Sequence, residues 1–341
     1  MTTEVMRLIN GALANFNSAE DFLLDQETWG RFMKYHWQAR EPIVINKNFT
    51  VSPEQFEQWH AQLTRCGRQH AEYDPETGKI VFTPGHNPAK KTLHAAMNQW
   101  FGELEHRLRV GNGNDFRHDL ADGFYLSGPH EGYYRTTDLH LRRADQEYPT
   151  LVVEMAFTES TETLFKRAKM WLDGTEGTTQ LVILLDVKEG RAPSMYSRRV
   201  RQGNRIWGLT DDDIAARFPA FWPFYHHIMY WYYHMDLPLT GHFKVDMYIW
   251  GRHMPEPDKI WGCDFPNDYR IPPAEHPGNG IGRDSMFRFN GISIPFPIDD
   301  LVREGEKGRR YVSYERAANA AVEKLRSLGL PYTGYVARGD D

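Results

Sequence analysis

The 341-residue sequence predicts an α/β fold built around one βαβ unit. The apolar run 151–156 is typical of a strand that is buried on both faces. A helix is expected at 163–172, and a second buried strand is expected at 180–187. A strand, a helix and a strand in this order predict one right-handed βαβ unit.

Local patterns predict the elements before this unit. Ser and Pro at positions 52 and 53 begin a short helix that runs to about residue 63. A turn-forming Asp-Pro-Glu-Thr-Gly stretch predicts a β-hairpin at 71–83. Apolar residues at helical spacing predict a helix at 90–109, which two glycines end. Short strands are expected at 123–126 and 138–141.

The pattern changes after the βαβ unit. Residues 190–242 are rich in aromatic side chains and interrupt the alternation, so we interpret them as an insertion. Strand character resumes at 245–250, and a loop rich in Pro and Gly is expected at 254–283. Asn-Gly predicts a closing hairpin at 287–298, and an amphipathic helix is expected at 314–328.

These elements divide the chain into three parts. Residues 1–69 form a helical N-terminal extension, and residues 70–303 form the α/β core with its insertion at about 190–242. Residues 304–341 form a C-terminal helix and tail. The length allows one large domain or two ordinary ones.

Composition excludes several classes of protein. The chain has 40 basic and 46 acidic residues, which gives a net charge of −6. This charge excludes an overall positive field of the kind that attracts nucleic acids or membranes, so any such contact must use a local basic patch. No segment resembles a targeting signal or a membrane span, so we expect no membrane partner. The two cysteines have no metal-ligand spacing. We expect an intracellular protein, cytoplasmic or nuclear.

Glu154 is the most informative residue, because it stands in the middle of the buried strand 151–156. An unpaired buried charge costs several kcal/mol, so a cation, a salt bridge or a raised pKa must compensate it. Asp138 begins the preceding strand, and neighbouring strands can place two carboxylates about 5 Å apart, close enough to share a divalent cation. The alternative is a buried salt bridge from Glu154 to a nearby basic residue. The candidates for that partner are Arg135, Arg142 and Lys166.

Lys166 follows on the helix after the Glu154 strand and lies four residues after Glu162. Lys166 can fold back over the end of the strand and meet Glu154. It can also form a solvated pair with Glu162, worth about 0.3–0.5 kcal/mol. The spacing leaves both interpretations open.

A local basic run follows the predicted sheet. Residues 188–205 contain six basic side chains and one acidic side chain, a balance of +5. Its arginines can hold phosphates near the site, or they can belong to a solvated hairpin. The candidate nucleic-acid contacts are Arg198, Arg199, Arg201 and Arg205. For the aromatic block 218–235 we favour a packed core over a base-stacking lid or a metal cluster, and self-association through it stays open.

Two stretches carry a resemblance to a known family. The first runs from Tyr73 through Glu76-Thr77-Gly78-Lys79-Ile80-Val81-Phe82 to Pro84, followed by His94 in a helix. The second runs from Thr137-Asp138 through Tyr148-Pro149-Thr150-Leu151-Val152-Val153-Glu154-Met155 to the strand at 181–186. The chain resembles the Uma-type restriction endonuclease family of the PD-(D/E)XK nuclease-like superfamily, and is nearest to its divergent fungal members. The resemblance covers residues 70–190 and, more weakly, 243–303.

The resemblance implies a restriction-endonuclease-like central mixed sheet and a Mg²⁺ or Mn²⁺ site. Asp138 and Glu154 match the two metal-binding acids, and the Met155 carbonyl is the expected third ligand. Thr137 replaces the family's Pro, and Ala156 replaces its Lys. Related families supply this lysine from the following helix, which points to Lys166.

Two functions are therefore expected. The first is a metal-dependent nuclease-like hydrolase that cleaves phosphodiesters of DNA or another nucleic acid, with Asp138, Glu154 and Lys166 as catalytic residues. The second is a catalytically weak or inactive nuclease fold that serves as a binding or interaction module. Ala156 and the acidic net charge motivate the second.

Overall fold

The structure is a computed structural model, and it describes most of the chain after residue 48. The described residues are 18, 43–44, 49–65, 71–82, 87–113, 115–120, 122–157, 159–190, 200–266, 272–277 and 285–332. Most of the predicted N-terminal extension lies outside them, and so do Arg198 and Arg199.

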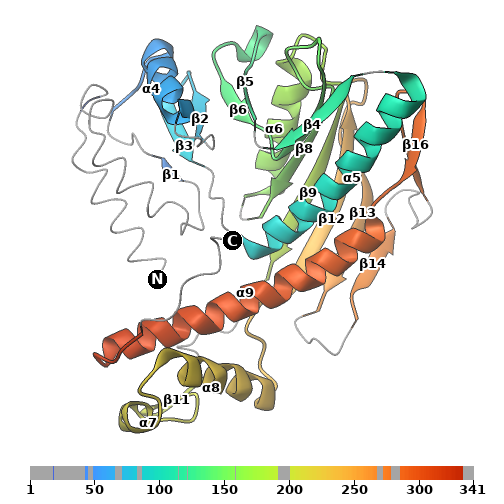
Figure 1. Ribbon diagram of the computed structural model, residues 1–341. Helices are drawn as coiled ribbons and strands as arrows, with labels where there is room; N and C mark the ends of the chain where they lie inside the picture. Colours follow the sequence, from blue (N-terminus) through green and yellow to red (C-terminus); the bar gives the residue numbers. More distant parts are fainter. Residues whose placement is uncertain are drawn as a thin grey trace.

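A seven-stranded mixed sheet forms the centre of the fold (Figure 1). From one edge to the other its strands are β14 (Ala274–Pro277), β13 (Asp258–Phe265), β12 (Phe243–Gly251), β9 (Leu181–Glu189), β8 (Leu151–Ala156), β7 (Leu139–Arg143) and β4 (Phe116–Leu120). The pair β8 and β9 is parallel, and α6 (Thr161–Asp173) connects them. The predicted strand, helix and strand are therefore confirmed.

Helices cover both faces of this sheet. On one face, α5 (Pro88–Asn112) and the first part of α9 (Ile298–Ser327) share one hydrophobic cluster with Val153 and Met155 of β8. On the other face, α6 packs against Val152 and Ala156. Every residue of β8 is buried, as the apolar run predicts. The charge of Glu154 is thus in a dry interior.

A second, five-stranded sheet lies beside the first. Its strands in order are β1 (Ile43–Val44), β3 (Lys79–Phe82), β2 (Ala71–Asp74), β6 (Tyr134–Thr136) and β5 (Gly123–Tyr125). The predicted hairpin corresponds to β2 and β3. The helix α4 (Pro53–Arg65) packs on this sheet through Phe56, whose ring stacks on Tyr73 at 4.5 Å between centroids.

The predicted start of the last helix at residue 314 is wrong, because α9 begins at Ile298 and passes through the proposed boundary at 303/304. Gly305 and Gly308 weaken the helical signal in the sequence. Both glycines allow close packing. A Cβ at position 308 would lie 2.6 Å from the Cα of Ala89 on α5, and one at 305 would lie 2.5 Å from the Phe265 ring.

The loop expected at 254–283 is also wrong in part, because β13 and β14 lie within it. The pattern of β13 is hard to recognise because Gly262 interrupts it and because proline and glycine flank it. The closing hairpin was predicted correctly and consists of β15 (Met286–Phe289) and β16 (Ile292–Pro295).

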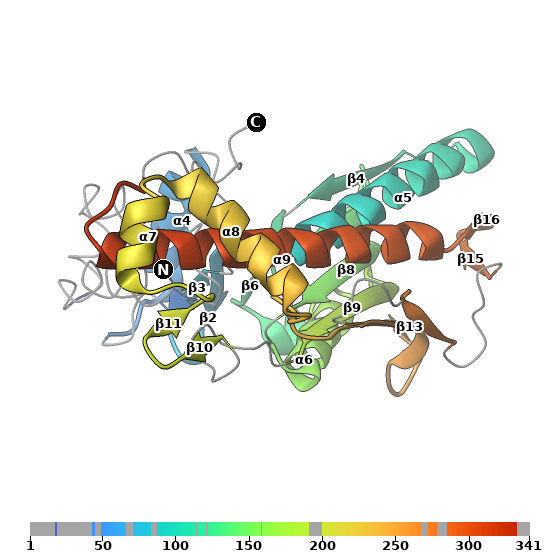
Figure 2. The same cartoon turned by 90° about the horizontal axis from the view of Figure 1, so that it is seen from below.

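The segment at 200–242 lies apart from the sheet and packs against the second half of α9 (Figures 1 and 2). It contains the short strands β10 (Arg201–Gln202) and β11 (Arg205–Ile206), and the helices α7 (Asp211–Arg217) and α8 (Phe221–His234). One face of α8 is packed, as expected for the aromatic block, and self-association through its exposed rings stays a prediction. Among helices in the described ranges, none has the length and apolar character needed to span a membrane.

Candidate functional site

Asp138 and Glu154 lie on neighbouring strands at one end of the main sheet. Leu139 of β7 pairs with Val153 of β8, so the same antiparallel register places Asp138 opposite Glu154. The backbone N–H of Met155 donates a hydrogen bond to Oδ2 of Asp138 over 2.7 Å. The register therefore brings together the two carboxylates that the sequence singled out.

A lysine from α5 neutralises Asp138. The Nζ atom of Lys90 lies 2.7 Å from Oδ1 of Asp138, and His94 on the next turn of α5 contacts the Asp138 carbonyl oxygen through Nε2 at 2.9 Å. Burial alone would raise the pKa of Asp138, but the charges of Lys90 and Arg167 and the Met155 hydrogen bond hold it below its ordinary value. Each carboxylate oxygen of Asp138 therefore has a partner.

Glu154 is fully buried and has two partners on α6. The guanidinium of Arg167 binds its Oε2, and the indole Nε1 of Trp171 donates to its Oε1 over 2.6 Å. Burial raises the pKa of Glu154 and the carboxylates of Asp138 and Glu72 add to this rise, whereas Arg167 opposes it. The compensating cation is thus Arg167, which is none of the three candidates that spacing suggested.

Arg167 itself is surrounded by carboxylates. Its guanidinium also lies 3.0 Å from Glu159 and 3.8 Å from Glu72 of β2. Burial disfavours its charge, but Glu154, Glu72 and Glu159 outweigh this and raise the pKa of Arg167 well above its ordinary value. Arg167 therefore stays charged at any pH at which the fold persists.

The side chain of Lys166, in contrast, is 73% exposed and forms an ion pair with Glu162 over 2.9 Å. This is the solvated pair that spacing left as an alternative. Helical phase could have identified Arg167 instead, because it lies three residues after Leu164 and four before Trp171, on the buried face of α6.

The buried charges form one network that connects the two sheets. Glu72 of β2 pairs with Arg135 of β6 over 2.5 Å and reaches Arg167 of α6. The network contains four carboxylates and three cations, so one carboxylate has no cation to balance it. The carboxylates are Glu72, Asp138, Glu154 and Glu159, and the cations are Lys90, Arg135 and Arg167.

The basic run lies elsewhere. Arg201 and Arg205 are exposed on the β10–β11 hairpin, and α9 lies between this hairpin and the main sheet (Figure 1). Both arginines line an open cavity of about 430 Å³. Its other charged lining residues are Lys324, Asp211, Asp212 and Glu323. A phosphate held by the hairpin is therefore not presented to Asp138 and Glu154.

Comparison with known proteins adds no assignment. No protein-family model matches the sequence, and no curated protein matches it.

Proposed function

We propose that this protein is a nuclease-fold binding module for nucleic acid, in which internal cations replace the metal of a two-carboxylate centre. The contact between the Arg167 guanidinium and Glu154 carries this proposal. The resemblance to the Uma-type family supplies the expected fold, and the α/β architecture with a central mixed sheet is consistent with it.

The ion pairs explain why a metal would bind poorly at this centre. Mg²⁺ requires carboxylate oxygens that are free to coordinate it at about 2.0–2.1 Å. At Asp138 and Glu154, all four oxygens have partners within the protein. A metal would have to displace Arg167, and a buried charge that loses its partner costs about 3–5 kcal/mol. Hydrolysis is therefore disfavoured, while the fold remains intact.

The hairpin supplies the binding surface in this proposal. Within the described residues, neither the Arg201 nor the Arg205 guanidinium forms an ion pair, so both are available to phosphate oxygens. Arginine binds phosphate through a planar pair of N–H donors, which suits a nucleic-acid backbone. Because such contacts ignore the bases, we expect binding that is weak, sensitive to salt and independent of sequence.

Fluorescence anisotropy with a labelled DNA duplex tests this surface. In the variant Arg201→Gln/Arg205→Gln, we expect the negative slope of log K against log salt concentration to become shallower by about 1.8, since each phosphate contact contributes about 0.9 to its magnitude. The matched control is Arg303→Gln/Arg310→Gln, which removes two exposed charges from the other end of α9. Equal salt slopes in the two variants would refute the role of the hairpin.

A metal-dependent hydrolase is the second candidate, and two observations favour it. Asp138 stands opposite Glu154 in the strand register, and the network holds one carboxylate in excess. This candidate requires Arg167 to leave Glu154 when a metal binds. It predicts Mn²⁺-dependent cleavage of DNA or RNA that Asp138→Asn and Glu154→Gln each abolish. Absence of cleavage together with hairpin-dependent binding would favour the binding module.

A further inference from the structure

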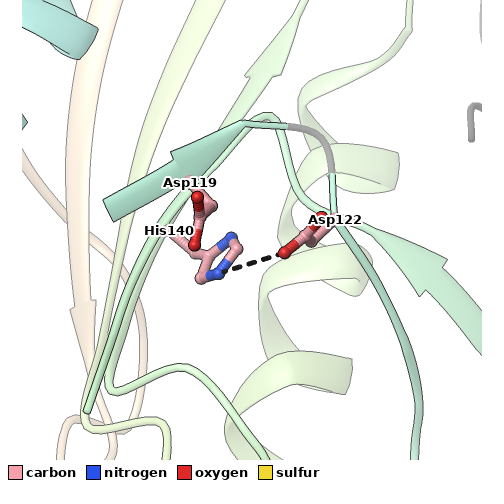
Figure 3. Close-up of side chains that lie close together, drawn as sticks. All are labelled: Asp119, Asp122 and His140. Atoms are coloured by element: carbon pink, nitrogen blue, oxygen red, sulfur yellow. Dashed lines mark ion pairs between the residues drawn. The ribbon is translucent and has the colours of Figure 1, made fainter. Parts of the chain in front are cut away.

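A second group of possible ligands lies at the edge of the main sheet (Figure 3). Asp119 of β4 stands directly opposite His140 of β7, and Asp122 follows the end of β4. The ligand atoms of the three side chains all lie within 4.8 Å of one another. The spacing of these residues in the sequence does not indicate a site.

His140 is fully buried, and its Nε2 atom has no hydrogen-bond partner. Its Nδ1 lies 3.1 Å from the hydroxyl of Thr137, which donates to the carbonyl oxygen of Asp122. This hydroxyl therefore accepts the Nδ1 proton, and the lone pair of Nε2 faces Asp122 with 3.9 Å to Oδ2. A lone pair that faces a carboxylate oxygen has no positive charge to interact with.

The charges around the group differ from those around Glu154. In the described part of the chain, no lysine or arginine forms an ion pair with Asp119 or Asp122. Burial raises the pKa of Asp122 and Asp119 adds to this rise, while Arg142 opposes it without pairing. The group is therefore a pair of carboxylates with a buried imidazole and no internal cation.

We propose that Asp119, Asp122 and His140 bind a divalent transition-metal ion such as Zn²⁺. The ligands are Nε2 of the imidazole and one oxygen from each carboxylate, with solvent in the fourth position. An imidazole nitrogen with two carboxylates suits Zn²⁺, whereas Mg²⁺ and Ca²⁺ prefer oxygen ligands alone.

The fold permits the geometry that this ion needs. In a tetrahedral site the ligand atoms lie about 3.4 Å apart, so the present arrangement must contract slightly. Asp119 is exposed and can turn inward, while His140 is held by the sheet and by Thr137. The hydroxyl of Thr137 is then a positioning group that orients the imidazole. This site does not depend on the nuclease likeness.

Calorimetric titration of the chelator-treated full chain with Zn²⁺ tests the proposal, with the visible spectrum of bound Co²⁺ as a second readout. We expect one equivalent to bind, and Asp119→Asn/Asp122→Asn to lose binding. The matched control Asp115→Asn/Asp145→Asn removes two exposed carboxylates from the same sheet edge and should bind as the unmodified chain does.

Two further variants separate this site from the Asp138 centre. Thr137→Val should weaken Zn²⁺ binding by about 10–100-fold, because it removes the group that orients His140. Glu154→Gln should leave Zn²⁺ affinity unchanged. The proposal is wrong if the unmodified chain binds no Zn²⁺ or Co²⁺. It is also wrong if Asp119→Asn/Asp122→Asn binds with undiminished affinity.

Discussion

Replacing Glu154 by glutamine should destabilise the fold by about 3 kcal/mol. The substitution preserves volume and an oxygen for the Trp171 indole, but it removes the carboxylate that binds the Arg167 guanidinium. Breaking a buried ion pair by removing one partner costs about 3–5 kcal/mol. The low end applies, because Glu159 at 3.0 Å and Glu72 at 3.8 Å still compensate the guanidinium.

The converse substitution should cost more. Arg167→Met leaves the carboxylates of Glu72 and Glu154 buried without the cation that they share, so we expect about 5 kcal/mol. The double variant should lose less than the sum of the two single losses, because both changes remove the same interaction.

Urea unfolding followed by circular dichroism measures these differences. The midpoint temperature of thermal unfolding should decrease by about 6 °C for Glu154→Gln, at about 2 °C per kcal/mol for a large domain. Glu162→Gln is the matched control on the same helix: its carboxylate is 78% exposed, and its loss should change stability by less than about 0.5 kcal/mol. A Glu154→Gln variant as stable as the unmodified chain would refute the buried pair and would leave Glu154 free to bind a metal.

Three further predictions concern other parts of the fold. Lys166→Ala should change the free energy of unfolding by less than about 0.5 kcal/mol and leave nucleic-acid binding unchanged, since the side chain is solvated. A loss of binding or of any cleavage in this variant would support the catalytic role that the sequence suggested for Lys166. Gly308→Ala should lower stability by about 1–3 kcal/mol in urea unfolding, because the new methyl group meets the Ala89 backbone at 2.6 Å. Burial raises the pKa of Tyr73 and of Tyr248 to about 12, so their contribution to stability is complete below pH 10 and is lost as the pH rises through 12; the ultraviolet absorbance of tyrosinate should show them ionising only as the chain unfolds.

The sequence predicted the centre of the fold well because its signals there are local. The all-apolar run at 151–156 has few alternatives to a strand buried on both faces, and the following helix and strand have ordinary periodicity. The signal weakened where long-range packing decides the structure. The first half of α9 contains Gly305 and Gly308, which weaken the helical pattern. Both glycines are needed for close packing against Phe265 and Ala89, two residues that are distant from them in sequence.

The candidate site was predictable only in part for a similar reason. Strand spacing indicated that Asp138 and Glu154 are neighbours, and the register agrees. Spacing could not identify the compensating cations, since Lys90 comes from α5, 48 residues before Asp138 (138 − 90). The Asp119, Asp122 and His140 group was missed because its members show no recognised metal-ligand motif and converge only when β4 pairs with β7.

The two groups of carboxylates differ in where their positive charge comes from. At Asp138 and Glu154 the fold supplies a lysine and an arginine, each held in place by its own helix. Beside Asp119 and Asp122 the fold places a buried imidazole, which offers a lone pair instead of a charge. A cation from solution would therefore compete with internal partners at the first group and would complete the second. For this reason a metal titration of Glu154→Gln separates the two proposals: unchanged Zn²⁺ affinity assigns the metal to the sheet edge, whereas lost affinity assigns it to the centre that Arg167 now occupies.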